Sequence, residues 1–470
     1  MAITEALESP NRSPLRWLGY ATFFGMMVLP TTYQIERGVL LGLVCLMAVY
    51  RALFSGRLAI DHRVLHLTIF YVAVGFGYWI WGTARGNPGA TPSLTVFVLW
   101  PLVYLLLISL INKSHVQGLI KTMVLGSLAI EGYGLMYLFH SKGWLPSSLY
   151  INLNAGQRAG FYGVNDVGLT LYSFTTLIFL LPFNLTVLLT VPKAHRNSPV
   201  LTDGVLALTL LLGLILTLLS GRRGLVVSIG LTPLLLLLLR TLIPALPWKG
   251  IGHFVGRFAL FSGIGLVALL FVGSSFQLSF SGLSSNFLAG FNFNGGALNT
   301  PTFTAIEGQS GAVIRGKEAA ALWSGANEYP FFGAGLGAVA PGYTRDPFHP
   351  WAYELSYLDY LFEFGFVGIF AFLSGGAWIV WRCGQIARAR DPVLSLWMLP
   401  LLVGLISFVI ATTANPYIGK FDFLWVIFLP VAFINSDFLD RSEVFPSDSA
   451  PSFKIRASTQ GHDHGSSLQS

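Results

Sequence analysis

Between residues 203 and 240 the sequence reads DGVLALTLLLGLILTLLSGRRGLVVSIGLTPLLLLLLR. Two strongly apolar runs lie on either side of a short polar break, Ser220-Gly221-Arg222-Arg223-Gly224. A bilayer core about 30 Å thick needs about 20 apolar residues per helix, and each run comes close to that length. This stretch therefore predicts two membrane-spanning helices joined by a tight turn.

The same pattern recurs along the chain. Of its 470 residues, 54% are hydrophobic and only 10% are charged, whereas a soluble domain carries about 25% charged residues. This composition excludes a soluble globular protein. We expect an all-α, polytopic membrane protein with about 12 transmembrane helices. The expected spans lie near residues 17–32, 38–54, 64–83, 93–111, 117–139, 167–190, 203–219, 224–240, 255–276, 354–380, 396–414 and 421–436.

These spans divide the chain into four parts. A long segment rich in Ser, Gly, Asn and Phe precedes the tenth helix, and loops of that length are usually functional or disordered. Its second half, from Arg315 to Tyr329, has helix-forming composition and then meets a Pro330–Gly337 turn. The expected parts are residues 1–276 with transmembrane helices 1–9, a large periplasmic loop at 277–353, helices 10–12 at 354–438, and a disordered cytoplasmic tail at 439–470.

The basic residues indicate topology rather than nucleic-acid binding. The net charge is +7, but the Lys and Arg residues are scattered singly instead of forming one stripe. With the N-terminus inside, most of the 28 Lys and Arg residues fall in cytoplasmic segments, as the positive-inside rule requires. The two cysteines, Cys45 and Cys383, lie within or at the end of apolar segments and indicate no disulfide or metal site.

Four arginines lie on the outer side, where topology does not explain them: Arg158, Arg222, Arg223 and Arg315. A guanidinium group can donate two parallel hydrogen bonds to phosphate oxygens, so these residues are candidate phosphate ligands. Contact with lipid headgroups is the alternative for Arg222 and Arg223. Arg158 begins a glycine-containing segment that ends at Gly168 and opens the expected sixth helix, where N-terminal amides favour anions. Asn165 in this segment is also a candidate helix cap, and the two roles are compatible.

Acidic residues cluster after the large loop. Glu354 and His349 are candidate general bases on the outer face, because either can take a proton from a sugar hydroxyl. The helix dipole alone also accounts for an acid at Glu354, and an exposed loop histidine often has no role. Asp359 and Glu363 lie four residues apart on one helix face and deeper in the membrane, which the dipole does not explain.

The order of these motifs resembles that of the O-antigen ligase and O-antigen polymerase superfamily of bacterial membrane glycosyltransferases. The resemblance runs from Arg158 to Gly368. Its matching pieces are the Arg158–Gly168 segment, the Ser220–Gly224 turn with Arg223, then Arg315, Trp323, the Asn-x-x-Pro-x-x-Gly-x-Gly pattern at Asn327–Gly335, Tyr357-Leu358, and Glu-x-Gly-x-x-Gly at Glu363–Gly368.

One position departs from the family. The family has a catalytic histidine before its Asn-x-Tyr-Leu motif, and the ungapped alignment puts Glu354 there, whereas His349 fits only with an insertion. A glutamate can perform the same proton transfer, so the base stays open between the two residues. Because ligases of the family keep the histidine, the departure favours the polymerases.

The resemblance implies an inverting, metal-independent transferase without cofactors, in the bacterial inner membrane with its active site facing the periplasm. Its donor would be an undecaprenyl diphosphate-linked oligosaccharide, and its acceptor another glycan or, for a ligase, lipid A-core. Membrane lipid and a chain-length regulator protein would be further partners. Arg158, Arg222, Arg223 and Arg315 would bind the diphosphate, and Asn165, Trp323 and Tyr357 would bind substrate. A flippase for lipid-linked sugars is the alternative from another class; it predicts duplicated halves, and no repeat is evident. A non-catalytic assembly protein is a third alternative, in which Glu354 at the histidine position reflects lost activity.

Overall fold

The computed structural model describes most of the chain. The described residues are 14–30, 32–55, 58–141, 143–153, 163–165, 168–171, 173–196, 198–220, 223–242, 256, 263, 303–304, 311–389, 391, 393–413 and 415–444. Most of them lie in helices, and the strands among them are only two or three residues long. The expected all-α class is therefore confirmed.

The first half of the chain forms a series of helices with short connections. They are α2 (Pro14–Val28), α3 (Gln34–Ser55), α4 (His62–Ala84), α5 (Ala90–Leu94), α6 (Trp100–Ser109), α7 (Val116–Ser141) and α8 (Phe174–Thr190). Asp61 caps α4, because its side chain accepts the backbone N–H of Arg63 at 2.9 Å. A π-helical turn, Thr95–Leu99, joins α5 to α6. Pro101, two residues after this turn, cannot donate to the regular α-helical ladder.

The second half adds longer helices and a few short strands. Its helices are α9 (Asp203–Leu219), α10 (Arg223–Leu242), α13 (Gly311–Glu328), α14 (Ser356–Arg388), α15 (Ser395–Thr412) and α16 (Phe421–Val444). Strands β1 (Gly163–Asn165) and β2 (Gly168–Thr170) pair antiparallel, and β3 (Phe303–Thr304) pairs parallel with β4 (Tyr343–Thr344). Single 3₁₀ turns occur at Lys113–His115, Ser147–Leu149, Lys193–His195 and Pro199–Leu201.

Within the described residues, seven helical segments are long and apolar enough to cross a membrane. They are α3, α4, the continuous α5–α6 segment, α7 with its preceding turn, α10, α14 and α16, and the shorter apolar helices are α8, α9 and α15. The chain is thus a helical membrane protein. The count of 12 spans stays a prediction, and its ninth span at 255–276 lies outside the described residues except for Gly256 and Gly263.

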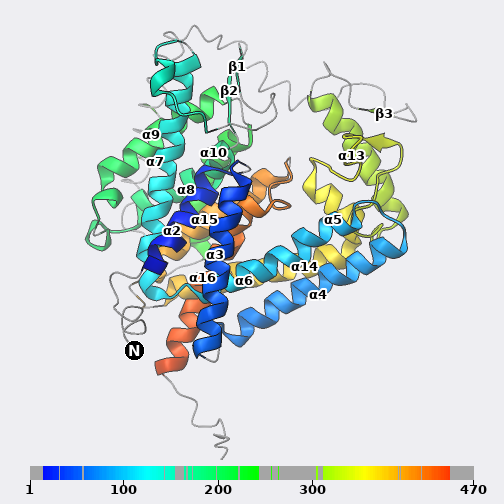
Figure 1. Cartoon of the computed structure of the whole chain (residues 1–470), viewed down its shortest axis with the longest axis horizontal. Coiled ribbons are helices and arrows are strands. Elements are labelled where there is room, and N and C mark those ends of the chain that lie inside the picture. Colours follow the sequence, from blue (N-terminus) through cyan, green and yellow to red (C-terminus); the bar gives the residue numbers. More distant parts are fainter. Residues whose placement is uncertain are drawn as a thin grey trace, which may run out of the picture.

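Helices α8 and α15 form the centre of the bundle (Figure 1). Every residue of α8 from Phe174 to Leu188 is buried. Gly404 allows α15 to approach α8 closely, because an added Cβ there would lie only 3.0 Å from the Phe179 ring. Helices α7, α9 and α10 pack around α8, while α14 and α16 pack against α15. A helix that is apolar on all sides belongs at such a centre.

Two boundaries differ from the sequence expectations. Helix α8 begins at Phe174 rather than near residue 167, because residues 163–170 contain the β1–β2 hairpin. Asn165 therefore pairs with Gly168 in this hairpin and does not cap the helix. Helix α16 continues to Val444, past the expected start of the tail at residue 439. The helix expected from Arg315 to Tyr329 is confirmed as the larger part of α13.

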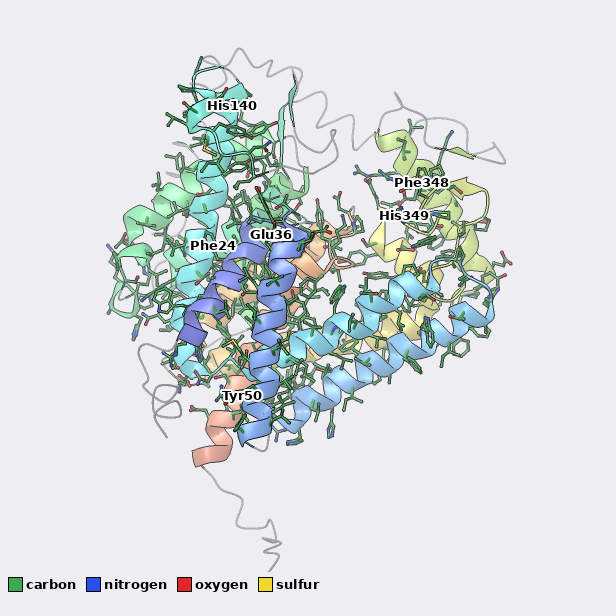
Figure 2. The ribbon with its side chains drawn as sticks, viewed as in Figure 1. Phe24, Glu36, Tyr50, His140, Phe348 and His349 are labelled. Atoms are coloured by element: carbon green, nitrogen blue, oxygen red, sulfur yellow. The ribbon has the colours of Figure 1, made fainter. Side chains whose placement is uncertain are left out.

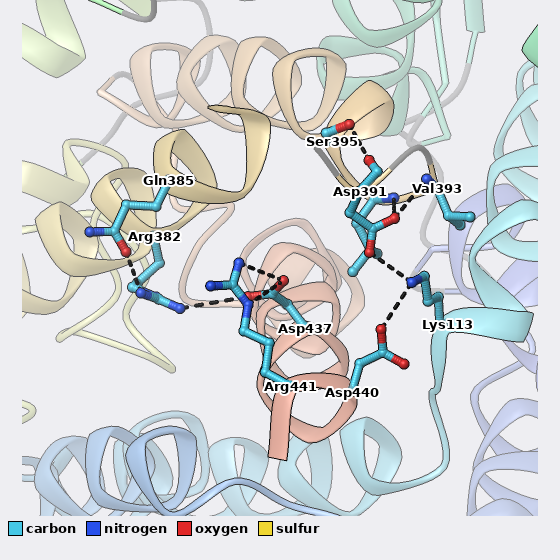
Figure 3. A network of polar contacts seen from close by, with 10 residues as sticks. Lys113, Arg382, Gln385, Asp391, Val393, Ser395, Asp437, Asp440 and Arg441 are labelled. Carbon is cyan, nitrogen blue, oxygen red and sulfur yellow. Dashed lines mark hydrogen bonds and ion pairs between the residues drawn. The ribbon is translucent and has the colours of Figure 1, made fainter. Parts of the chain in front are cut away.

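The end of α14 that is far from α13 carries a network of ion pairs (Figure 3). Lys113 Nζ lies 2.7 Å from Asp391 Oδ2 and 2.9 Å from Asp440 Oδ2, so it links three separate segments. Close by, the Asp437 carboxylate pairs with Arg382 of α14 and with Arg441 of its own helix. All three basic residues belong to segments whose charge predicts a cytoplasmic location.

Candidate functional site

The ledge, residues 311–355, lies at one end of the bundle and begins with α13 (Figure 1). Helix α13 lies directly beside the start of α14, because an added Cβ at Gly325 would lie 2.5 Å from the ring of Phe362. Leu322 and Ala326 of α13 are buried with Phe362 in a small apolar cluster, separate from the core of the bundle. The ledge thus has an apolar core of its own.

After α13 the chain passes through a glycine loop, residues 333–337, whose three glycines have φ between +66° and +89°. Other residues rarely adopt this conformation. The loop also approaches the backbone of α4 and α5. An added Cβ on Gly335 would lie 2.8 Å from Gly82 Cα, and one on Gly337 would lie 1.9 Å from the carbonyl carbon of Gly89. The Gly-x-Gly sequence at Gly333–Gly335 therefore has a packing reason.

Side chains from distant parts of the chain hold this glycine loop. Asn87 Nδ2 donates to the carbonyl oxygens of Ala334 and Leu336, at 3.0 and 3.2 Å. The backbone N–H of Gly337 donates to Glu363 Oε1 at 2.6 Å. The deep acid at Glu363, which the helix dipole did not explain, thus has a structural partner in the loop.

Four charged residues form one cluster above the start of α14. Arg315 Nε donates to Glu354 Oε2 at 2.8 Å, and Arg345 Nη2 donates to Glu354 Oε1 at 2.6 Å. The other end of the Arg345 fork, Nη1, donates to Glu318 Oε2 at 3.3 Å. This charge cluster of Arg315, Glu318, Arg345 and Glu354 contains two residues that the sequence singled out and two that it did not.

Glu318 fixes the backbone that carries Glu354. Its Oε1 accepts the backbone N–H groups of Glu354 and Leu355, at 2.6 and 2.7 Å. These N–H groups lie just before α14, so Glu318 of α13 caps the neighbouring helix. The Tyr343 hydroxyl donates to the other oxygen at 3.3 Å. Because the Glu318 side chain is fully buried, every one of these bonds is protected from water.

Burial and neighbouring charges shift the pKa values of Glu318 and Arg345 in opposite directions. Burial raises the pKa of Glu318, while the N–H of Leu355 and the guanidinium of Arg345 oppose the rise. Burial alone would lower the pKa of Arg345, but attraction to Glu354 and Glu318 raises it instead. Arg345 therefore stays cationic at any physiological pH.

The candidate base His349 pairs with a different acid. Its Nδ1 is 3.0 Å from Asp346 Oδ2, and the hydrogen bond lowers the pKa of Asp346. The ring also packs edge-on against Trp351, and its side chain is 57% exposed. Figure 2 shows His349 next to Phe348, in the part of the ledge beside α13. Of the two candidate bases, Glu354 alone is in contact with the guanidinium groups of the charge cluster.

The two aromatic candidates have different surroundings. Trp323 lies on the exposed side of α13, and 55% of it is accessible. Tyr357 is half-buried, and its hydroxyl donates to the carbonyl of Val409 in α15. Trp323 is therefore free to stack on a ligand, whereas Tyr357 connects α14 to α15.

The start of α10 lies at the same end of the bundle as the start of α14. A Cβ added at Gly224 would lie 3.5 Å from the Cβ of Ala411 in α15. Tyr357 bonds to Val409, which is in the same part of α15. The first residues of α10 and α14 thus pack against one segment of α15.

Four of the expected ligands are described only in part or not at all. Arg223 is the first residue of α10, but its side chain lies outside the described residues. Arg158 and Arg222 lie wholly outside them. Asn165 is in β1, with its side chain undescribed. Their roles stay predictions.

Sequence reasoning missed Glu318, Arg345 and Tyr343. Glu318 had a usable signal, since it follows Arg315 by three positions in a helix-forming segment and so shares its face. Arg345 is separated from its partners by an irregular connection, and no local pattern marks it.

Within the described residues, no group of three His, Cys, Asp or Glu side chains is placed to hold a metal ion. The expectation of metal-independent chemistry stays a prediction. No model of a known protein family matches the chain, and none of the curated proteins compared with it matches either.

Proposed function

We propose that the chain is a membrane glycosyltransferase that polymerises undecaprenyl diphosphate-linked repeat units of O-antigen or exopolysaccharide at the periplasmic face of the inner membrane. The motif resemblance motivates the proposal, and the contact between Arg315 and Glu354 is the observation that carries it. A candidate phosphate ligand and a candidate base, 39 positions apart, share one ion pair at 2.8 Å.

The chemistry needs two groups at this place. A base removes the proton from the acceptor hydroxyl, whose oxygen then attacks the anomeric carbon of the donor. The bond from that carbon to the diphosphate breaks, and guanidinium groups stabilise the charge on the departing diphosphate. Glu354 is the base in this mechanism, and Arg315 and Arg223 bind the diphosphate. Direct displacement inverts the anomeric configuration.

The location of the cluster also supports the proposal. Arg315 and Glu354 are 29% and 25% exposed at the side chain, so polar substrates can reach them. They lie above α14, next to helices that are apolar enough to cross a membrane. A lipid-linked glycan needs such a place, because its lipid stays in the bilayer while its diphosphate and sugars reach the aqueous side.

The test is a transfer reaction with purified protein in detergent. The protein is incubated with its lipid-linked repeat unit alone, then with added lipid A-core, and the products are separated by size. A ladder of longer lipid-linked chains without added acceptor supports a polymerase. Product only with lipid A-core identifies a ligase instead. With a verified donor, no product in either reaction contradicts the transferase proposal and favours a flippase or an assembly protein.

A further inference from the structure

The carboxylate of Glu354 occupies the place that an anionic substrate needs. Each of its two oxygens accepts a hydrogen bond from a different arginine, Arg315 at 2.8 Å and Arg345 at 2.6 Å. Two neighbouring oxygens of a diphosphate can accept from two guanidinium groups in the same manner. While the carboxylate is held in this way, neither arginine is fully available to another anion.

We propose that Arg315 and Arg345 form a two-guanidinium site for a diphosphate, which the Glu354 carboxylate occupies until the substrate displaces it. The inference rests on the proposed function for the identity of the anion. It concerns binding alone and adds Arg345, a residue outside the family motifs, to the site. When the diphosphate binds the two arginines, it displaces the Glu354 carboxylate and so releases the base.

The anchoring of Arg345 supports this exchange. One end of its guanidinium, Nη1, is held by Glu318, while the other end, Nη2, contacts Glu354. The Glu318 side chain is fully buried, and its carboxylate also accepts two backbone N–H groups. It therefore cannot leave without exposing several unsatisfied groups. Arg345 remains in place when Glu354 departs.

The Glu354 carboxylate is more exposed than the Glu318 carboxylate, as expected if Glu354 leaves the arginines and Glu318 stays. The Glu354 side chain is 25% exposed and the Glu318 side chain 0%. Arg315 and Arg345 are 29% and 28% exposed, so a dissolved anion can reach both guanidinium groups. The cluster thus combines a fixed carboxylate with an exchangeable one.

The exchange has a mechanistic consequence. Without donor, Glu354 is held by both arginines and does not activate water or acceptor. When a diphosphate takes the arginines, the carboxylate loses these two hydrogen-bond partners and is released beside the bound donor. When the diphosphate product leaves, the carboxylate returns to the arginines.

Binding of inorganic pyrophosphate to the full-length protein in detergent tests this proposal by isothermal titration calorimetry. Glu354→Gln removes the internal anion, and we expect its Kd for pyrophosphate to fall roughly tenfold. Asp346→Asn is the matched control. It makes the same change in net charge in the same segment, but Asp346 pairs with His349 instead of the arginines. Its Kd should stay within roughly twofold of wild type, because exposed charges are well screened.

Two further variants locate the site. Arg345→Lys keeps the positive charge but loses the planar fork, and should weaken pyrophosphate binding roughly tenfold. Adding Arg315→Gln to Glu354→Gln should remove the gain in affinity. If Glu354→Gln does not give folded protein, Glu354→Asp replaces it. Its shorter side chain cannot reach both arginines as well, and it should tighten binding to a smaller degree.

The proposal is overturned if removal of the Glu354 carboxylate leaves the Kd unchanged. It is equally overturned if Asp346→Asn tightens binding as much as Glu354→Gln does, since net charge alone would then explain the effect. The transferase proposal fails separately, in the transfer reaction. A protein with the expected affinities but no transfer would keep the anion exchange and lose the glycosyltransferase assignment.

Discussion

The backbone N–H of Glu354 donates to the buried carboxylate of Glu318 at 2.6 Å, although 36 positions separate the two residues. Glu318 therefore fixes the position of Glu354 through a backbone N–H group, and this hydrogen bond does not involve the Glu354 carboxylate. Glu318 also binds the backbone N–H of Leu355, so one side chain fixes both the candidate base and the residue that precedes α14. Four predictions concern this site and the neighbouring glycine loop, and a fifth concerns the ion pairs at the other end of α14.

Glu318→Ala should lower the free energy of unfolding by about 3 kcal/mol, because two backbone N–H groups and Arg345 lose their buried partner. Thermal unfolding in detergent measures the loss. Glu328→Ala, at an exposed position of the same helix, is the control and should change stability by less than about 0.5 kcal/mol. Equal effects of the two substitutions would contradict the capping role of Glu318.

Glu354→Gln should reduce transfer at least about 100-fold, because an amide cannot accept the proton of the acceptor hydroxyl. His349→Gln should leave the rate within about threefold of wild type, since His349 pairs with Asp346 outside the charge cluster. Initial rates with the lipid-linked repeat unit as substrate separate the two. The reverse pattern would make His349 the base.

Arg315→Ala and Arg223→Ala should each abolish transfer while the amount of protein in the membrane stays constant. The physical reason is the loss of charge stabilisation on the departing diphosphate, which costs about 3 kcal/mol or more. Arg85→Ala is a suitable control, because its guanidinium stacks on Tyr329 at 4.1 Å from the ring centroid and not on an acid. Near-wild-type transfer by the first two variants would rule out the arginines as diphosphate ligands.

Gly337→Ala should destabilise the protein by at least about 3 kcal/mol, since its Cβ would meet the backbone of Gly89 at 1.9 Å. Gly86→Ala separates this clash from conformational strain. Gly86 has φ +76° but nothing within 4 Å of an added Cβ. It should cost only about 1 kcal/mol, the penalty for a left-handed non-glycine residue. Equal losses in thermal unfolding would show that φ alone makes glycine necessary.

Because the pKa of Asp391 is lowered, the free energy of unfolding should decrease as the pH falls into the acid range. Burial alone would raise its pKa, but the hydrogen bond from Lys113 and other contacts lower it below the ordinary value. A lowered pKa means that the stabilisation is present above the unfolded pKa of about 4 and is lost as pH falls through the folded value. Asp391→Asn should be about 1 kcal/mol less stable than wild type at pH 7. This gap should close below about pH 4 in thermal unfolding scans, and a constant gap would exclude the linkage.

The helices were largely predictable because their physical cause is local. Long apolar runs between Gly, Pro and charged breaks were sufficient to place α9, α10 and α14 to within a few residues at their starts. The start of α8 was misplaced because its preceding residues are also apolar and glycine-rich. Hydropathy does not distinguish a short hairpin at residues 163–170 from the first turns of a helix.

Only two of the four residues of the charge cluster were predictable, because the other two join it through tertiary contacts. Arg315 and Glu354 were identified from their chemistry and from the motif order, and the structure places them in contact. Arg345, the second arginine that binds Glu354, comes from the connection between α13 and α14. The path of this connection depends on how the glycine loop packs on α4 and α5. No pattern in a single sequence encodes that path.

The packing of the glycine loop also has a consequence for biosynthesis. Asn87, which binds the loop, precedes Leu336 by 249 positions. At the usual rate of translation, about 5 to 20 residues per second, Asn87 waits roughly 10 to 50 seconds for its partner. Glu363, the other side chain that binds the loop, emerges later still. The end of the molecule that carries the charge cluster therefore cannot assemble until the chain has been synthesised into α14.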